Sequence, residues 1–182
     1  MLSYFCKTLL PTLLFGLLLL SQASSSGAQP SAAQPEQDIK AAYLYNFIKF
    51  ITWPEFTSEQ TFNLCILGED PLNSTLKRLD ERLVHGAPLK IQNISSLSPA
   101  SQCRVIFIGH SEERGLDGIF SFLGQSPVLT VSTIDDFAIL GGTIGFITLG
   151  NRVRFNINLK HAQQAKLTIS SKLLELANKV VK

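Results

Sequence analysis

Residues 62–71 read FNLCILGEDP, a short apolar run that passes directly into a turn. The run at 62–67 is bounded by turn-forming residues and therefore predicts a strand. Asp70 is a candidate N-cap and Pro71 suits the first position of a helix, so a helix is expected next. The residues that would line one face of this helix, before it ends at His85-Gly86, are Leu72, Leu76, Leu79 and Leu83. A strand that leads through a tight turn into a helix is the beginning of an α/β unit.

The alternation of strands and helices continues toward the C-terminus. Residues 104–108 predict another strand, and the continuously apolar run after Arg104 favours burial on both faces. Residues 144–149 and 152–158 predict a hairpin around Gly150-Asn151. The other predicted elements are strands at 89–94 and 127–131, a helix at about 116–123, a short turn or helix at 135–138 before Gly141-Gly142, and a last helical region from 159 to about 181.

A first helix is predicted before these elements, at residues 35–51. Its candidate buried face consists of Ile39, Tyr43, Phe47 and Phe50. The helix is expected to stop at Trp53-Pro54, because proline disfavours helical geometry in the residue before it. Together the elements predict one three-layer α/β domain, in which flanking helices cover a mostly parallel sheet with an antiparallel C-terminal hairpin. If the first three strands take the order 2-1-3, the strands at 62–67 and 104–108 are neighbours.

An export signal is predicted at the N-terminus. Lys7 is the only charged residue among the first thirty, and an apolar stretch of signal-peptide length follows it. Small residues fit cleavage after Ala23 or as late as Ala28, and an uncleaved signal anchor is the alternative. The resulting division is a signal peptide at 1–23, a flexible leader at 24–37 and one domain at 38–182.

The composition limits the class of protein. The chain has 182 residues, of which 45% are hydrophobic and 16% are charged, and its net charge is +2. A chain this apolar is not mainly disordered. A nucleic-acid-binding protein would need a clearly basic domain, so no nucleic-acid partner is expected.

The cysteines predict a disulfide. Of the three in the chain, Cys6 would leave with the signal peptide. Cys65 and Cys103 are then expected to pair, as is usual in exported proteins, with two free buried thiols as the alternative. The pairing agrees with the assumed strand order, because Cys65 lies in the first strand and Cys103 adjoins the third. The three histidines do not cluster with the cysteines in the sequence, so no metal site is predicted.

The sequence lacks the motifs of catalytic and nucleotide-binding sites. It has no G-x-G-x-x-G after a strand, no G-x-x-x-x-G-K-[ST] loop and no G-x-S-x-G nucleophile elbow. We therefore predict no catalytic residue, no cofactor and no enzymatic activity. A ligand site without catalysis is a remaining hypothesis, because open α/β sheets bind ligands at the carboxyl ends of their strands. The candidate rim consists of Glu69, Asp70, His110 and Ser111, with Ser132 and Thr133 beside them.

The C-terminal region carries an apolar stripe that is broad for one helix. Docking on the sheet is the ordinary role of such a stripe, and contact of a part of it with another protein or a second copy is the alternative. The candidate interface residues are Arg152, Arg154, Leu174 and Val181.

Several segments, taken in order, carry a resemblance to a known family. They are 40–47 (KAAYLYNF) with Lys49-Phe50 and Trp53-Pro54, 64–71 (LCILGEDP), 103–108 (CRVIFI) with Ser111-Glu112, 127–132 (PVLTVS) with Phe137-Ala138 and Gly141-Gly142, 152–158 (RVRFNIN) and 169–177 (ISSKLLELA). As an ordered set they resemble the YfiR family of small periplasmic bacterial proteins. The resemblance covers about residue 38 to the end of the chain.

The resemblance implies a regulatory role in the periplasm. The best understood members restrain an inner-membrane diguanylate cyclase by binding its periplasmic part, and an OmpA-like outer-membrane lipoprotein draws the repressor away. We therefore expect a repressor that controls cyclic-di-GMP signalling. The alternative is a periplasmic small-molecule sensor. Exposed parts of the C-terminal apolar stripe would separately favour a homodimer. Some relatives carry a second cysteine pair, but this chain has no cysteine after Cys103, so control through a second disulfide is not expected.

Overall fold

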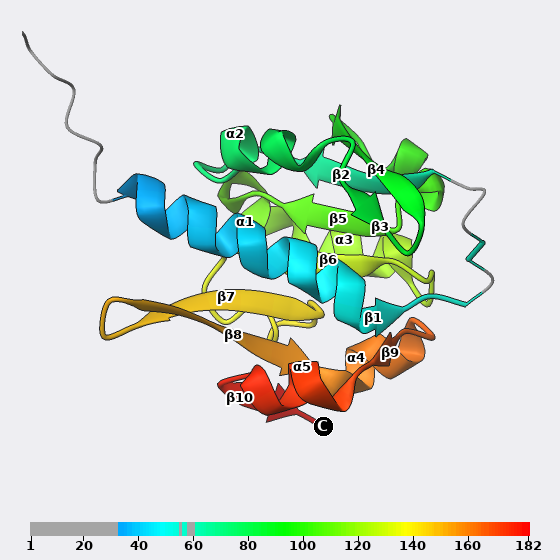
Figure 1. The fold of residues 1–182 in the computed structure, drawn as a ribbon. Coiled ribbons are helices and arrows are strands. Elements are labelled where there is room, and N and C mark those ends of the chain that lie inside the picture. Colours follow the sequence, from blue (N-terminus) through cyan, green and yellow to red (C-terminus); the bar gives the residue numbers. More distant parts are fainter. Residues whose placement is uncertain (1–32, 55, 58–60) are drawn as a thin grey trace, which may run out of the picture.

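A computed structural model of the chain describes residues 33–54, 56–57 and 61–182. An eight-stranded sheet with the order β10-β8-β7-β6-β5-β2-β4-β3 forms its centre (Figure 1). Its strands are β2 (Phe62–Leu67), β3 (Leu83–Val84), β4 (Ala87–Ile94), β5 (Val105–Ile108), β6 (Leu129–Ser132), β7 (Ile144–Leu149), β8 (Arg152–Asn158) and β10 (Lys179–Val181). A separate two-stranded sheet pairs β1 (Ile51–Thr52) with β9 (Thr168–Ile169).

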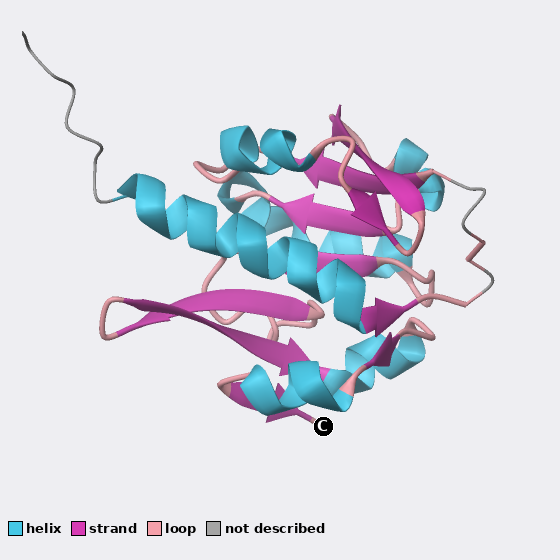
Figure 2. Ribbon diagram, in the orientation of Figure 1, coloured by secondary structure: helices cyan, strands magenta, loops and turns pink. Residues whose placement is uncertain are grey.

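Helices lie on both faces of the large sheet, as Figure 2 shows. The α-helices are α1 (Ala33–Phe50), α2 (Asn73–Leu76), α3 (Leu116–Leu123), α4 (Leu159–Gln164) and α5 (Ser171–Leu176), and the 3₁₀ helices are η1 (Lys77–Leu79), η2 (Ser98–Gln102) and η3 (His110–Gly115). Residues of α1 and α2 pack into one apolar cluster, whereas residues of η2 and α3 pack into a second cluster. The predicted three-layer α/β domain is confirmed.

The middle of the sheet is parallel. The pairs β4–β2, β2–β5, β5–β6 and β6–β7 are all parallel, and β7–β8 is the predicted antiparallel hairpin. Because β4, β2 and β5 are neighbours in that order, the assumed 2-1-3 arrangement of the first three strands is confirmed. Two further edge strands complete the sheet, since β10 runs parallel to β8 and β3 antiparallel to β4.

Alternate residues of the central strands enter opposite cores, which explains why these strands are apolar throughout. In β2, Leu64 and Ile66 belong to the cluster under α1, while Cys65 and Leu67 belong to the cluster under α3. The same alternation occurs in β5, where Phe107 belongs to the cluster under α1 and Ile106 and Ile108 belong to the cluster under α3. A strand that is covered by helices on both faces has no side chains in contact with water, so polar residues are not favoured at any of its positions.

The predicted buried face of the first helix is wrong at both ends. Ile39 is 47% exposed and Phe50 is 38% exposed, whereas Leu44, Phe47 and Ile48 are fully buried. At about 100° per residue, Ile39 and Phe50 lie close together on one flank of the helix. The buried stripe through Ala41, Leu44 and Ile48 is centred more than a quarter turn away from them.

The predicted second helix is shorter than expected. Only α2 and η1 are helical, and Pro71 precedes the first helical residue instead of occupying that position. Leu72, Leu76 and Leu79 are buried as predicted, but Leu83 belongs to β3 and is 67% exposed. The chain leaves the helix because β3 pairs antiparallel with β4 through the turn that begins at His85.

The predicted C-terminal helix is also wrong as a continuous element. After α4, Lys166 adopts a positive φ of 57°, and the chain then forms β9, α5 and β10. Each short strand has a distant partner, since Ile169 pairs with Ile51 and Val180 pairs with Ile157. Residues 135–138 form turns, which was one of the two alternatives for that segment.

The N-terminal predictions lie mostly outside the described residues, which begin at position 33. Helix α1 starts at Ala33, so residues 33–37 of the expected leader are helical. No helix in the described part of the chain is both long enough and apolar enough to cross a membrane.

Candidate functional site

The disulfide joins two neighbouring parallel strands. Cys65 in β2 and Cys103, two residues before the start of β5, are bonded, and their Cα atoms lie 5.8 Å apart. Both side chains are buried, with exposures of 0% and 2%. The predicted pairing is therefore present, and it anchors the chain at the entry of β5 to the centre of the sheet.

The strands β2 and β5 form a switch point of the sheet, because the chain continues from β2 to α2 on one face and from β5 to α3 on the other. The loops that follow the two strands are tied together. The Glu69 N–H donates to Ser111 Oγ at 2.8 Å, and the Ser111 N–H donates to the Glu69 carbonyl at 3.2 Å. These two rim residues are brought together, but their hydrogen bonds close the crevice between the loops.

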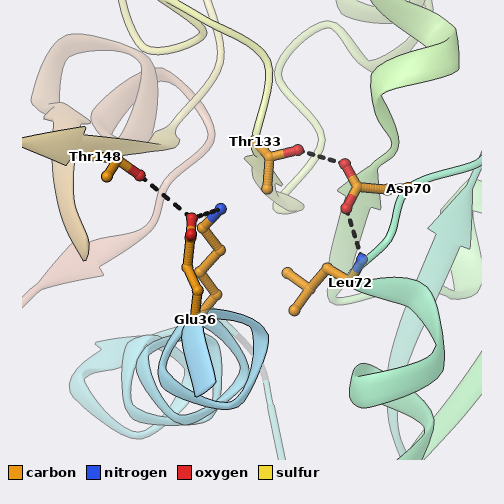
Figure 3. Close-up of polar contacts among 6 residues, drawn as sticks. Glu36, Asp70, Leu72, Thr133 and Thr148 are labelled. Atoms are coloured by element: carbon orange, nitrogen blue, oxygen red, sulfur yellow. Dashed lines mark hydrogen bonds and ion pairs between the residues drawn. The ribbon is translucent and has the colours of Figure 1, made fainter. Parts of the chain in front are cut away.

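Asp70 is used in the same structural way. One of its carboxylate oxygens accepts from the Leu72 N–H at 2.8 Å, and the other accepts a short hydrogen bond from the Thr133 hydroxyl (Figure 3). Asp70 therefore makes a turn and joins the loop after β2 to the loop after β6. It does not cap a helix as predicted, because α2 begins only at Asn73.

His110 and Ser132, two further polar residues of the predicted rim region, make different contacts. His110 is exposed, and its Nε2 lies 3.7 Å from a carboxylate oxygen of Glu113 in the same turn. Among the described residues no hydrogen bond or ion pair joins His110 to Glu69, Asp70 or Ser111. Ser132 is fully buried, and its hydroxyl donates to the Ile108 carbonyl at 2.7 Å.

An open cleft lies beside this closed crevice, at the carboxyl ends of β2 and β4. Its volume is about 530 Å³, and Glu69 is the one predicted rim residue that lines it. The polar residues that sequence reasoning missed are Asn73, Lys77, Asn93, Ser95 and Glu112. The signal that could have found some of them is their position at the carboxyl end of a strand, since Asn93 is the penultimate residue of β4 and Ser95 directly follows the strand.

The hairpin β7–β8 extends past the carboxyl ends of β2 and β5 (Figure 1). Strand β6 pairs only with Ile144 and Gly145 of β7, and the rest of the hairpin continues alone. We call residues 146–149 and 152–155 the arm. One side of the arm contacts α1, where Glu36 accepts from Thr148 Oγ1 at 3.3 Å (Figure 3).

The Glu36 carboxylate also accepts from Lys40 Nζ at 2.7 Å. This hydrogen bond is the main reason that the pKa of Glu36 is lowered from its ordinary value, with the charge of Lys40 and the Thr148 hydroxyl contributing further. The first turn of α1 is thus linked to the inner side of the arm.

The opposite side of the arm, which we call its outer face, consists of Ile147, Leu149, Arg152 and Arg154. These residues pair across the hairpin as Ile147–Arg154 and Leu149–Arg152, so all four project to the same side. Arg152 and Arg154 are exposed, and Leu149 is 51% exposed. Among the described residues neither guanidinium forms an ion pair with a carboxylate.

The other two candidate interface residues lie elsewhere. Leu174 is half-buried and packs against the core under α1. Val181 pairs with Asn158, which is about 20 Å along β8 from Arg152 at 3.3 Å per residue. The predicted set therefore does not form one surface.

The described residues offer no metal centre. No group of three or more His, Cys, Asp or Glu side chains in the described part of the chain is arranged to hold a metal ion.

Comparison with solved structures supports the fold. The chain is similar to a conserved domain protein from Vibrio cholerae O1 biovar El Tor strain N16961, with a TM-score of 0.57 and 12% identity over 79% of this chain and 60% of that one. It is also similar to an ABC domain in complex with L-Trp from Streptococcus pneumoniae, with a TM-score of 0.55 and 13% identity over 78% of this chain and 62% of that one. The chain spans about six tenths of the length of both structures, and the likeness concerns the fold alone.

A protein-family model described as YfiR/HmsC-like matches residues 37–178. The family consists of periplasmic, non-catalytic regulators of cyclic-di-GMP signalling. The match covers the whole sheet up to β10 and includes both cysteines of the disulfide. The chain therefore belongs to the YfiR/HmsC-like family.

Proposed function

We propose that the chain binds the periplasmic part of a membrane-bound diguanylate cyclase and represses it, so that less cyclic-di-GMP is made. Membership of a family of periplasmic regulators supports the pathway. The observation that supports a binding surface is the outer face of the arm. It carries two exposed arginines that form no ion pair with a carboxylate in the described part of the chain, next to the exposed Leu149 and the half-buried Ile147.

The chemistry of the outer face suits a protein partner. Arginine is enriched at protein interfaces and contributes strongly to affinity, and the buried core of such an interface is more apolar than the rest of the surface. Leu149 and Ile147 would supply the apolar contact, and Arg152 and Arg154 would flank it with positive charge. The complementary surface on the cyclase is an apolar centre with acidic residues around it.

The backbone of the arm offers a second mode of contact. Strand β10 pairs with β8 only at Asn156–Asn158, so the outer edge of β8 at 152–154 is not covered by a described strand. An open edge accepts an extended segment through main-chain hydrogen bonds, while side chains on alternate positions select it. An acidic extended segment of the cyclase fits both the edge and the arginines.

The test is direct binding between the purified chain and the periplasmic part of the cyclase encoded beside its gene, measured by calorimetry. The variant R152E/R154E should bind at least about tenfold more weakly, because two favourable charge contacts become repulsive. The control K160E/K172E changes the net charge by the same amount at exposed positions of α4 and α5. If both variants lose affinity for the cyclase fragment equally, the loss is an effect of net charge and the role of the arm is overturned. If the wild type does not bind at tens of micromolar, the proposed partner is overturned.

An OmpA-like outer-membrane lipoprotein is the second partner that we propose. If it draws the chain away from the cyclase, its periplasmic domain should release the cyclase fragment from the complex. A ternary complex of all three proteins would contradict competition. Sedimentation of the chain alone, in the same buffer, determines whether the competing species is a monomer or the expected homodimer.

A further inference from the structure

The cleft at the carboxyl ends of β2 and β4 has no part in the proposed contact with the cyclase. Its base is formed by the strand ends, where Ile66, Leu67 and Ile94 have exposures of 1%, 5% and 9%. Its volume of about 530 Å³ is within the usual range for small-molecule sites. An apolar base next to the switch point of a parallel sheet is a common location for a ligand.

Charges of both signs surround this apolar base. Lys77 comes from η1, Glu69 from the loop after β2 and Glu112 from η3, and all three line the cleft. The remaining polar lining residues are Asn73, Asn93 and Ser95. A ligand with a single negative charge would face two carboxylates, and a ligand with only positive charge would face Lys77. A small molecule that carries both charges matches the lining best.

The wall that contains Glu112 depends on a glycine. Gly68 has a φ of +78°, and a Cβ atom there would lie 2.5 Å from Glu112 Cγ and 2.6 Å from Ser111 Oγ. Only glycine permits both this backbone conformation and this close approach. Glu112 Oε1 also accepts from the Ser111 hydroxyl at 3.2 Å, which helps to orient the carboxylate.

Asn73 adds an acceptor without a partner. Its Nδ2 donates to the Gly68 carbonyl at 2.9 Å, but its buried Oδ1 has no hydrogen-bond donor among the described residues. A buried acceptor that lacks a donor is costly, so a bound N–H group next to Asn73 would be favoured.

We propose that this cleft binds a small aliphatic amino acid as a zwitterion. The ammonium group lies on the side of Glu69, Glu112 and Asn73, and the carboxylate lies on the side of Lys77. The aliphatic side chain covers the apolar base of the cleft. The site supplies a small-molecule input to a protein whose partner contact lies on the arm.

The charge requirement can be tested with three molecules of similar shape. L-leucine carries both charges, 4-methylpentanoate lacks the ammonium group, and 3-methylbutylamine lacks the carboxylate. Calorimetric titration of the purified chain should show binding of L-leucine and at least about tenfold weaker binding of each analogue, since each loses a charge-assisted contact. Binding of the amine or the acid alone with equal affinity would overturn the zwitterion, and no binding of L-leucine at about 10 mM would overturn the site.

Substitutions of residues that line the cleft test whether the ligand binds there. K77M and E112Q should each weaken L-leucine binding at least about tenfold, whereas K172M and E175Q remove the same charges from α5 and should leave it unchanged. Thermal unfolding of each variant confirms that it is folded. Equal binding by K77M and the wild type would contradict the site. All titrations use the chain alone, so this proposal can fail while binding to the cyclase stands, and the reverse.

Discussion

Removal of the Cys65–Cys103 disulfide should cost the domain a large part of its stability. The bond closes a loop with a sequence separation of 38 residues. In the chain-entropy model a loop of this length restricts the unfolded chain by about 4 kcal/mol at 25 °C. Whole domains have a free energy of unfolding of about 5–15 kcal/mol, so the bond contributes a substantial fraction.

The expected change in melting temperature follows from the size of the domain. For chains of about 150–250 residues, 1 kcal/mol shifts the melting temperature by about 2–4 °C, so reduction should lower it by about 8–16 °C. Because both cysteines are buried, the protein must be reduced in urea and refolded with the reductant present. Differential scanning calorimetry then compares the oxidised and reduced wild type.

The variant C65A/C103A separates the bond from other effects of the reductant. It should melt near the reduced wild type and show no further change when reductant is added. A titration of free thiols establishes that reduction is complete. If the fully reduced wild type melts within about 2 °C of the oxidised form, the loop-closure argument is refuted.

Other predictions concern packing and pH. An added Cβ at Gly142 would lie 2.0 Å from the ring of the fully buried Phe137, so G142A should destabilise the domain by about 1–3 kcal/mol in urea unfolding. Gly118 in α3 has open space around it, so G118A should stabilise the domain by about 0.5–1 kcal/mol, and a loss of stability would contradict the described helix. Burial lowers the pKa of His161 below its ordinary value of 6.5, so the unfolded chain takes up the proton first as the pH falls. The wild type should therefore lose more stability than H161Q between pH 8 and pH 5. If the urea unfolding midpoints of the two proteins fall by the same amount over this pH range, the expectation is contradicted.

The strands were predictable where the local sequence alone determines them. The run at 62–67 and the hairpin at 144–149 and 152–158 have the expected boundaries, because apolar stretches there are enclosed by turn residues. The C-terminal region was not predictable in this way. Its strands β9 and β10 exist because they pair with β1 and β8, and no local pattern contains that information.

The candidate sites show the same limit. Glu69 and Ser111 were placed correctly at the carboxyl edge, but their mutual hydrogen bonds close the crevice that they were expected to line. The open cleft depends on the adjacency of β2 and β4 and on the space beside Gly68, which bring Lys77 and Glu112 to one hollow. Such a juxtaposition of distant residues follows only from the tertiary fold.

The most direct test of repression is the concentration of cyclic-di-GMP in cells of the source bacterium. Deletion of the gene for this chain should raise the concentration, and wild-type protein or the K160E/K172E control supplied from a plasmid should lower it again. R152E/R154E, exported and folded to the same level, should fail to lower it. An unchanged cyclic-di-GMP concentration after deletion would contradict repression, and full restoration by R152E/R154E would contradict binding through the arm.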